Sequence, residues 1–101
     1  MRYLGMFDWY EPDPAIACSS CGAATSGWQG QDGANALFVW RQGDAHPVAQ
    51  RADEPIEQEH FAEYSLPDRF RFLTTCGNGH ELLFEGLTTD GVWTDCVELM
   101  E

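Results

Sequence analysis

The amino-acid sequence predicts a mostly β fold, either a small antiparallel sheet or a two-layer β domain, with at most one short helix. Short runs rich in aromatic and β-branched residues outnumber segments with helical periodicity. Clusters of Gly, Pro, Asn and Asp separate these runs, as expected for turns between strands. The chain has 101 residues, of which 44% are hydrophobic, so one domain, 1–101, with one modest core is expected.

The N-terminal half is expected to contain two strands. Residues 2–10 are rich in aromatic and aliphatic side chains, and residues 11–14 end that strand because they include two prolines. Residues 23–35 are mainly small or polar around a single large apolar residue, Trp28, which predicts a loop. A second strand is expected at 37–41.

The C-terminal half begins with a polar, acidic stretch and then returns to strands. A short helix is expected near 54–64, with Asp53 as its N-terminal cap and Pro55 in its first turn. Strands are then expected at 69–75, 81–87 and 92–99. Arg69 and Arg71 should lie on the opposite face of their strand from Phe70 and Phe72. The last two strands meet at Asp90-Gly91, a favoured type I′ hairpin signal.

Three cysteines and a histidine lie in two turn motifs, Cys18-Ser-Ser-Cys21-Gly22 and Cys76-Gly-Asn-Gly-His80. The first spacing forms a tight turn that aims both sulfurs at one point, and its glycine permits the backbone reversal. In the second motif two glycines relieve strain between the cysteine and the histidine. Thiolate and imidazole ligands in a tetrahedron are what zinc prefers. The sequence therefore predicts a structural Zn²⁺ site held by Cys18, Cys21, Cys76 and His80.

Both motifs resemble those of small zinc-ribbon and zinc-knuckle domains. The resemblance covers only these two motifs and departs from the usual pattern in two ways. The second half is C-x₃-H rather than C-x₂-C, and the 54 residues between the halves exceed the usual spacing. The resemblance implies a structural metal site, but it implies no particular activity, because such sites occur in many unrelated proteins.

Other interpretations of the cysteines stay open. A lone C-x₂-C also suits a redox pair, although no βαβ setting is visible, and the cysteines can alternatively form disulfides or stay buried without a ligand. Cys96 lies in the middle of an expected strand and is predicted to be a small buried hydrophobe. It is also the alternative to His80 as the fourth ligand. His46 and His60 are expected to face solvent.

A non-catalytic protein is predicted rather than an enzyme. Four protein ligands would close the coordination sphere, whereas a catalytic zinc keeps one position for water. Glu81 directly follows His80, so a strand would point the two side chains to opposite faces. The sequence has no H-E-x-x-H, G-x-S-x-G, Walker or deaminase motif. A small metalloenzyme or a thiol enzyme that uses the zinc or Cys96 is the alternative.

The chain is strongly acidic, with 17 Asp and Glu against 5 Lys and Arg and a formal net charge of −12. Phosphate backbones and anionic membranes repel such a surface, so neither nucleic acid nor a membrane is expected as a partner. The first ten residues lack the apolar core of a secretory signal, and no apolar run approaches the roughly 18 residues of a membrane span. A cytoplasmic protein with reduced cysteines is expected.

The expected function is that of an acidic protein-binding module: an adaptor, or an inhibitor or immunity-type partner of a basic protein. An accessory subunit of a larger assembly is a further alternative. One candidate surface is the acidic run, Asp53, Glu54, Glu57 and Glu59, for which a solvated polar face is the competing interpretation. The other is Trp28, expected either to anchor an interface or, as the favoured outcome, to pack over the neighbouring knuckle.

Overall fold

The computed structural model describes residues 7–99, so residues 2–6 of the first expected strand lie outside the described part. A 3₁₀-helix, η1 (Gln58–Glu63), is the longest helix within that part, which confirms the mostly β prediction. None of the helical segments in residues 7–99 is long and apolar enough to cross a membrane. The strands are β1 (Asp8–Glu11), β2 (Trp28–Gly30), β3 (Phe38–Arg41), β4 (Ala49–Gln50), β5 (Arg69–Thr75), β6 (Glu81–Thr89) and β7 (Val92–Glu98).

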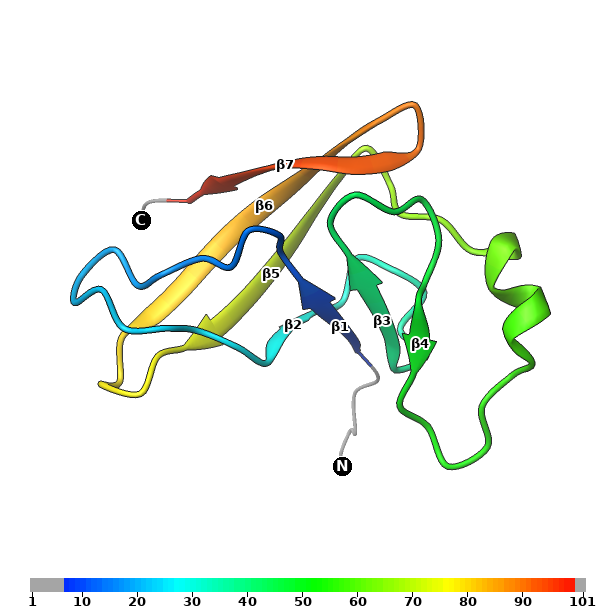
Figure 1. Ribbon diagram of the computed structural model, residues 1–101, viewed down its shortest axis with the longest axis horizontal. Helices are drawn as coiled ribbons and strands as arrows, with labels where there is room; N and C mark the ends of the chain where they lie inside the picture. The colour runs from blue at the N-terminus through cyan, green and yellow to red at the C-terminus, as the bar shows by residue number, and fades with distance from the viewer. Residues whose placement is uncertain (1–6, 100–101) are drawn as a thin grey trace.

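The seven strands form one curled sheet in the order β4-β3-β1-β2-β5-β6-β7 (Figure 1). Every neighbouring pair is antiparallel except β1 and β3, so the sheet is mixed where an antiparallel one was expected. The curl brings the turn after β3 to the start of β7. There the Gly43 N–H donates to the Trp93 carbonyl at 2.8 Å.

The sheet has a seam between β2 and β5. Only one residue pair, Gln29 with Leu73, joins these two strands in register, whereas β5 and β6 pair along the full length of β5. The Thr74 hydroxyl adds one bond across the seam by donating to the Ser26 carbonyl at 2.7 Å. The seam therefore separates a short-stranded half, β4-β3-β1-β2, from a long-stranded half, β5-β6-β7.

The core lies on the inner face of the curl and is mainly aromatic. Exposed and buried residues alternate along β5, so Phe70 and Phe72 point inward and Arg69 and Arg71 outward, as predicted. Tyr10 of β1 stacks on both phenylalanines across the seam, with ring centroids 5.4 and 5.6 Å apart. The buried cluster comprises Tyr10, Cys18, Trp28, Phe38, Trp40, Phe61, Leu66, Phe70, Phe72, Cys76, Leu82, Phe84 and Trp93.

A buried carboxylate organises the segment that leads into β3. Asp8 is 0% exposed, and its two oxygens accept hydrogen bonds from the backbone N–H groups of Asn35, Ala36 and Phe38 at 2.9–3.0 Å. The indole of Trp40 donates a fourth bond at 2.9 Å. The charge is thus satisfied by four donors, and the segment before β3 is tied to β1.

Most expected elements form, with three differences. The hairpin at Asp90-Gly91 is confirmed, since both residues have the positive φ that a type I′ turn requires. The expected helix shrinks to η1, and Glu57 rather than Asp53 is its N-cap, so the predicted cap is wrong. Strands β2 and β4 were not expected, because their Gly, Gln and Ala residues have low strand propensity and tertiary context overrides it.

Candidate metal centre

The two cysteine motifs meet at one end of the seam. Cys18 and Cys21 lie in the connection between β1 and β2, and Cys76 and His80 lie in the turn between β5 and β6 (Figure 1, blue loop and yellow turn). All four ligand atoms lie within 4.8 Å of one another. These residues, here termed the Cys/His cluster, form a candidate metal site.

Both motifs fold into tight turns, each closed by a backbone hydrogen bond to the carbonyl of its first cysteine. The N–H of Gly22 donates to the Cys18 carbonyl at 2.8 Å, and the N–H of Gly79 donates to the Cys76 carbonyl at 2.9 Å. The two glycines have φ of +75° and +85°, a left-handed conformation that costs glycine little and other residues more. Each turn folds back on itself, so both ligands of each motif point the same way.

The ligand atoms of the Cys/His cluster lie close together but are not covalently bonded to one another. The Sγ atoms of Cys21 and Cys76 are 3.8 Å apart, against about 2.05 Å in a disulfide. The Nδ1 atom of His80 lies 3.7 Å from the Sγ of Cys18 and 3.5 Å from that of Cys76. All four cysteines are free thiols. The imidazole therefore offers Nδ1 as its ligand atom toward the sulfurs.

Hydrogen bonds to sulfur favour the thiolate in part of the cluster. The side-chain amide of Asn78, which donates to Cys21 at 3.3 Å, and the Ala23 N–H lower the pKa of Cys21 to about 6. Burial opposes ionisation of Cys76, but the N–H groups of His80 and Asn78 outweigh it and lower its pKa. Bonds to Cys21 and Cys76 raise the pKa of His80. These donors stabilise the charge that a metal-binding thiolate carries.

The cluster lies where the core reaches the surface. Cys18 and Cys76 are 3% and 5% exposed and belong to the buried hydrophobic cluster, and burial raises the pKa of Cys18. Cys21 is exposed. The site is therefore packed from one side and open to solvent beside one thiol.

Cys96 does not belong to this group. It lies half-buried on β7, where its thiol donates to the Gln42 side-chain oxygen at 3.3 Å and burial raises its pKa. His46 and His60 are exposed, as predicted. His60 lies near Glu57 and Glu59, but all three are exposed, and such acidic groups are common without a metal.

The residues predicted to bind a partner divide into exposed and buried ones. Asp53, Glu54, Glu57 and Glu59 are all exposed, on the segment that leads into η1 and at its start. Trp28 is 2% exposed and packs edge-on against Phe72 and Phe84, with ring centroids 5.2 and 5.4 Å away. It lies in the same buried cluster as Cys18 and Cys76, so its ring does not reach the surface.

Two hydrogen bonds at the site were not predicted from the sequence. The sequence pattern assigns no role to Asn78, whose side-chain amide donates to the Cys21 sulfur at 3.3 Å. The flanking Gly77 and Gly79 are the local signal that Asn78 lies in a tight turn. The Ser19 hydroxyl of the first motif donates to Glu98 of β7 at 2.8 Å, a contact that only the strand order brings about. Comparison of the chain with protein families, with curated proteins and with solved structures finds no match.

Proposed function

We propose that this chain is a non-catalytic, acidic protein-binding module whose sheet is held together by one structural zinc ion in the Cys/His cluster. The geometry of the cluster is the observation that carries the zinc assignment. Zinc–ligand bonds of about 2.3 Å to sulfur and 2.0–2.1 Å to nitrogen give a tetrahedron with edges of about 3.8 Å between sulfurs and 3.5 Å from sulfur to nitrogen. The corresponding separations in the structure are 3.8 Å for Cys21–Cys76, and 3.7 and 3.5 Å from His80 to Cys18 and Cys76.

The donor set supports a structural role. Three sulfurs and one imidazole nitrogen supply all four positions of a tetrahedral site, and a catalytic zinc would need one of them for water. Asn78 and the turn N–H groups donate to the sulfurs, which is the support that outer groups commonly give to metal ligands. Bound zinc would supply a cross-link between the β1–β2 connection and the β5–β6 turn. The cross-link would span the seam, where backbone pairing is weakest.

Native mass spectrometry of the purified chain tests the metal. We expect one zinc per chain, loss of the zinc in Cys76→Ser, and retention in Cys96→Ser, whose residue lies outside the cluster. Both substitutions exchange one thiol for a hydroxyl, so Cys96→Ser is the matched control. Absence of zinc from the parent chain, or its loss only in Cys96→Ser, would overturn the ligand set.

The acidic run supports the binding function. Its carboxylates are exposed, and the neighbouring cation, Arg51, points away from them: its guanidinium stacks over Trp9 at 4.9 Å and lies 3.9 Å from Glu11. The run thus keeps its negative charge for a basic partner. Such a surface steers cationic proteins toward it and weakens as salt rises.

A charge-matched comparison separates a binding site from general acidity. An arginine-rich peptide serves as the probe, and its affinity is measured for the parent and for two triple variants. We expect Glu54→Gln, Glu57→Gln, Glu59→Gln to weaken binding more than Asp13→Asn, Asp44→Asn, Asp90→Asn, which removes the same charge from exposed positions elsewhere. Equal losses in the two triple variants would contradict a site at the acidic run.

A further inference from the structure

The outer face of the sheet carries a row of side chains that is mostly apolar. Register places Trp9 beside Gln29, Gln29 beside Leu73, and Leu73 beside Leu83. Leu99 continues the row, because its N–H donates to the Leu83 carbonyl at 2.9 Å. This outer row therefore runs from β1 across the seam to the end of β7.

The row is most exposed on the long-stranded half. Leu73 is 53% exposed and Val97, next to the row on β7, is 49% exposed, and these are the exposed large hydrophobic side chains of residues 7–99. Shallow grooves flank Leu73 and Leu83, one of about 430 Å³ that extends to Phe7 and one of about 370 Å³ that extends to Leu99. Exposed apolar surface that is gathered in one place commonly marks an interaction site.

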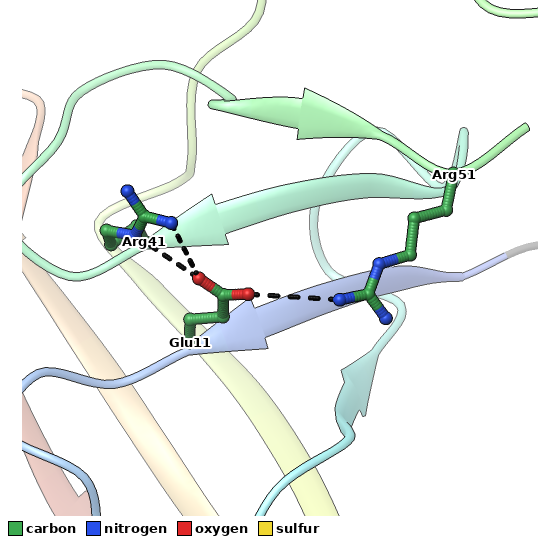
Figure 2. Close-up of polar contacts among 3 residues, drawn as sticks. All are labelled: Glu11, Arg41 and Arg51. Carbon is green, nitrogen blue, oxygen red and sulfur yellow. Dashed lines mark hydrogen bonds and ion pairs between the residues drawn. The ribbon is translucent and has the colours of Figure 1, made fainter.

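Two arginines lie on the same face over the short-stranded half. Arg41 is the register partner of Glu11 and donates to its carboxylate at 3.1 Å, and Arg51 approaches the other oxygen of that carboxylate at 3.9 Å (Figure 2). The Arg51 guanidinium also covers the outward-facing ring of Trp9. The carboxylate of Glu11 thus lies between two cations, which leaves this end of the face with an excess of positive charge.

Two more arginines lie on the outer face of β5. Arg71 lies opposite Glu85, and Arg69 lies opposite Leu87, whose other neighbour is Asp95. The outer face thus holds all four arginines of the described residues, and register places four carboxylates there: Glu11, Glu81, Glu85 and Asp95. Two further carboxylates, Asp32 and Glu98, line the grooves beside the outer row, so the face and its grooves hold four positive and six negative groups. This face is therefore far closer to neutral than the chain as a whole, whose net charge is −12.

We propose that a second copy of the chain binds this outer face, and that the two copies form a two-fold symmetric dimer with Leu73 and Val97 at its centre. Two molecules of charge −12 repel one another over most of their surfaces, so they approach most closely where the local charge nearly cancels. A face that carries both arginines and carboxylates can pair unlike charges with those of its own copy under two-fold rotation. Burial of the outer row supplies the attraction.

The size of the face indicates a weak dimer. The outer row crosses four strand spacings, or about 19 Å, which belongs to the small, transient class of interfaces. We therefore expect the dissociation constant of the dimer to lie between about 10 and 500 µM. The outer face does not include the acidic run. Failure of the dimer proposal would therefore not contradict the binding of a basic partner, and the reverse also holds.

Sedimentation velocity of the full chain over this concentration range tests the dimer. The average mass should rise from that of the 11.3 kDa monomer toward twice that value. Leu73→Glu and Val97→Glu should each weaken dimerisation at least about tenfold, because each buries a new charge in the contact. Ala62→Glu adds the same charge at an exposed position on η1 and should leave dimerisation unchanged.

The salt dependence of dimerisation provides a second, independent test. Raising NaCl from about 50 to 500 mM screens the repulsion between two acidic molecules and should strengthen the dimer. The same change should weaken the binding of a basic peptide. Circular dichroism and zinc content show whether each variant is folded. A monomer at every concentration, an equal effect of Ala62→Glu, or weakening of the dimer by salt would overturn the proposal.

Discussion

At the scale of single residues, the Asp8 carboxylate shows how much one buried charge can organise. Three backbone N–H groups and one indole N–H donate to it, and these donors come from the segment that enters β3 and from β3 itself. None of the four donors is close to Asp8 in the sequence, so the residues next to Asp8 give no indication of these hydrogen bonds. A charged residue in a predominantly aromatic strand is the only hint that the sequence offers.

Replacing Asp8 by asparagine tests this role with little change of volume. The new amide places N–H donors against N–H donors, so the free energy of unfolding should fall by about 3 kcal/mol. Urea unfolding measures the change. Asp44→Asn makes the same substitution at an exposed position and should alter stability by less than about 0.5 kcal/mol. Similar values for the two variants would show that Asp8 is not structurally important.

Tyr10 gives the fold a pH dependence on the alkaline side. Burial first, and then the charge of Asp8, raise the pKa of its phenol well above the ordinary value of about 10. The folded chain keeps this proton at pH values where the unfolded chain releases it. Its contribution is therefore full below about pH 10, and the free energy of unfolding falls as pH rises further, by at most about 1.4 kcal/mol per pH unit.

The variant Tyr10→Phe isolates that contribution. Urea unfolding from pH 8 to pH 11 should show a steeper loss of stability for the parent chain than for the variant. Cysteine ionisation affects both proteins alike, so the difference between the two curves belongs to Tyr10. Identical slopes would contradict the raised pKa.

At the scale of elements, the seam between β2 and β5 is the part of the sheet that depends most on side chains. Besides the single register pair, the Asp32 carboxylate accepts from the Arg71 N–H at 2.9 Å, on the opposite side of that pair from the Cys/His cluster. Asp32 thus takes the place of a strand carbonyl where β2 has ended. A metal at the other end would complete the closure of the seam.

Removal of the metal should therefore loosen the seam before it loosens the rest of the sheet. With a chelator present, we expect faster hydrogen exchange in the β1–β2 connection and in the β5–β6 turn, and a lower thermal midpoint. The paired strands β6 and β7 should keep their protection longer. Hydrogen-exchange mass spectrometry of the zinc-loaded and chelated chain measures this. Uniform acceleration over the whole sheet would contradict a local clamp.

Element positions were predictable where the pattern is strong and local. The alternation in β5 and the Asp90-Gly91 turn suffice to place the C-terminal hairpins, because period-two burial and turn chemistry act over a few residues. The strand β2 was not predicted, because only Trp28 among its three residues favours a strand. The Trp28 ring points inward, where it packs against aromatic rings of β5 and β6. The ligand motifs were visible in the sequence, but the position of the candidate site at the seam depends on strand order.

At the scale of the whole molecule, the distribution of charge matters more than its sum. Composition gives the net charge of −12 and favours a soluble, cation-seeking surface. It cannot reveal that the described arginines gather on one face, because Arg41 and Arg51 reach that face only through the parallel pairing of β1 with β3. The sequence thus indicates an acidic surface, and only the register separates that surface from a nearly neutral one.

The placement of the Cys/His cluster also sets an order of events during synthesis. Cys21 precedes Cys76 by 55 residues, so at about 5–20 residues per second the ribosome needs roughly 3–11 s to reach Cys76 after Cys21. Through that interval Cys18 and Cys21 lack the other two members of the Cys/His cluster. Since His80 directly precedes β6, all four members of the cluster are synthesised before β6 and β7.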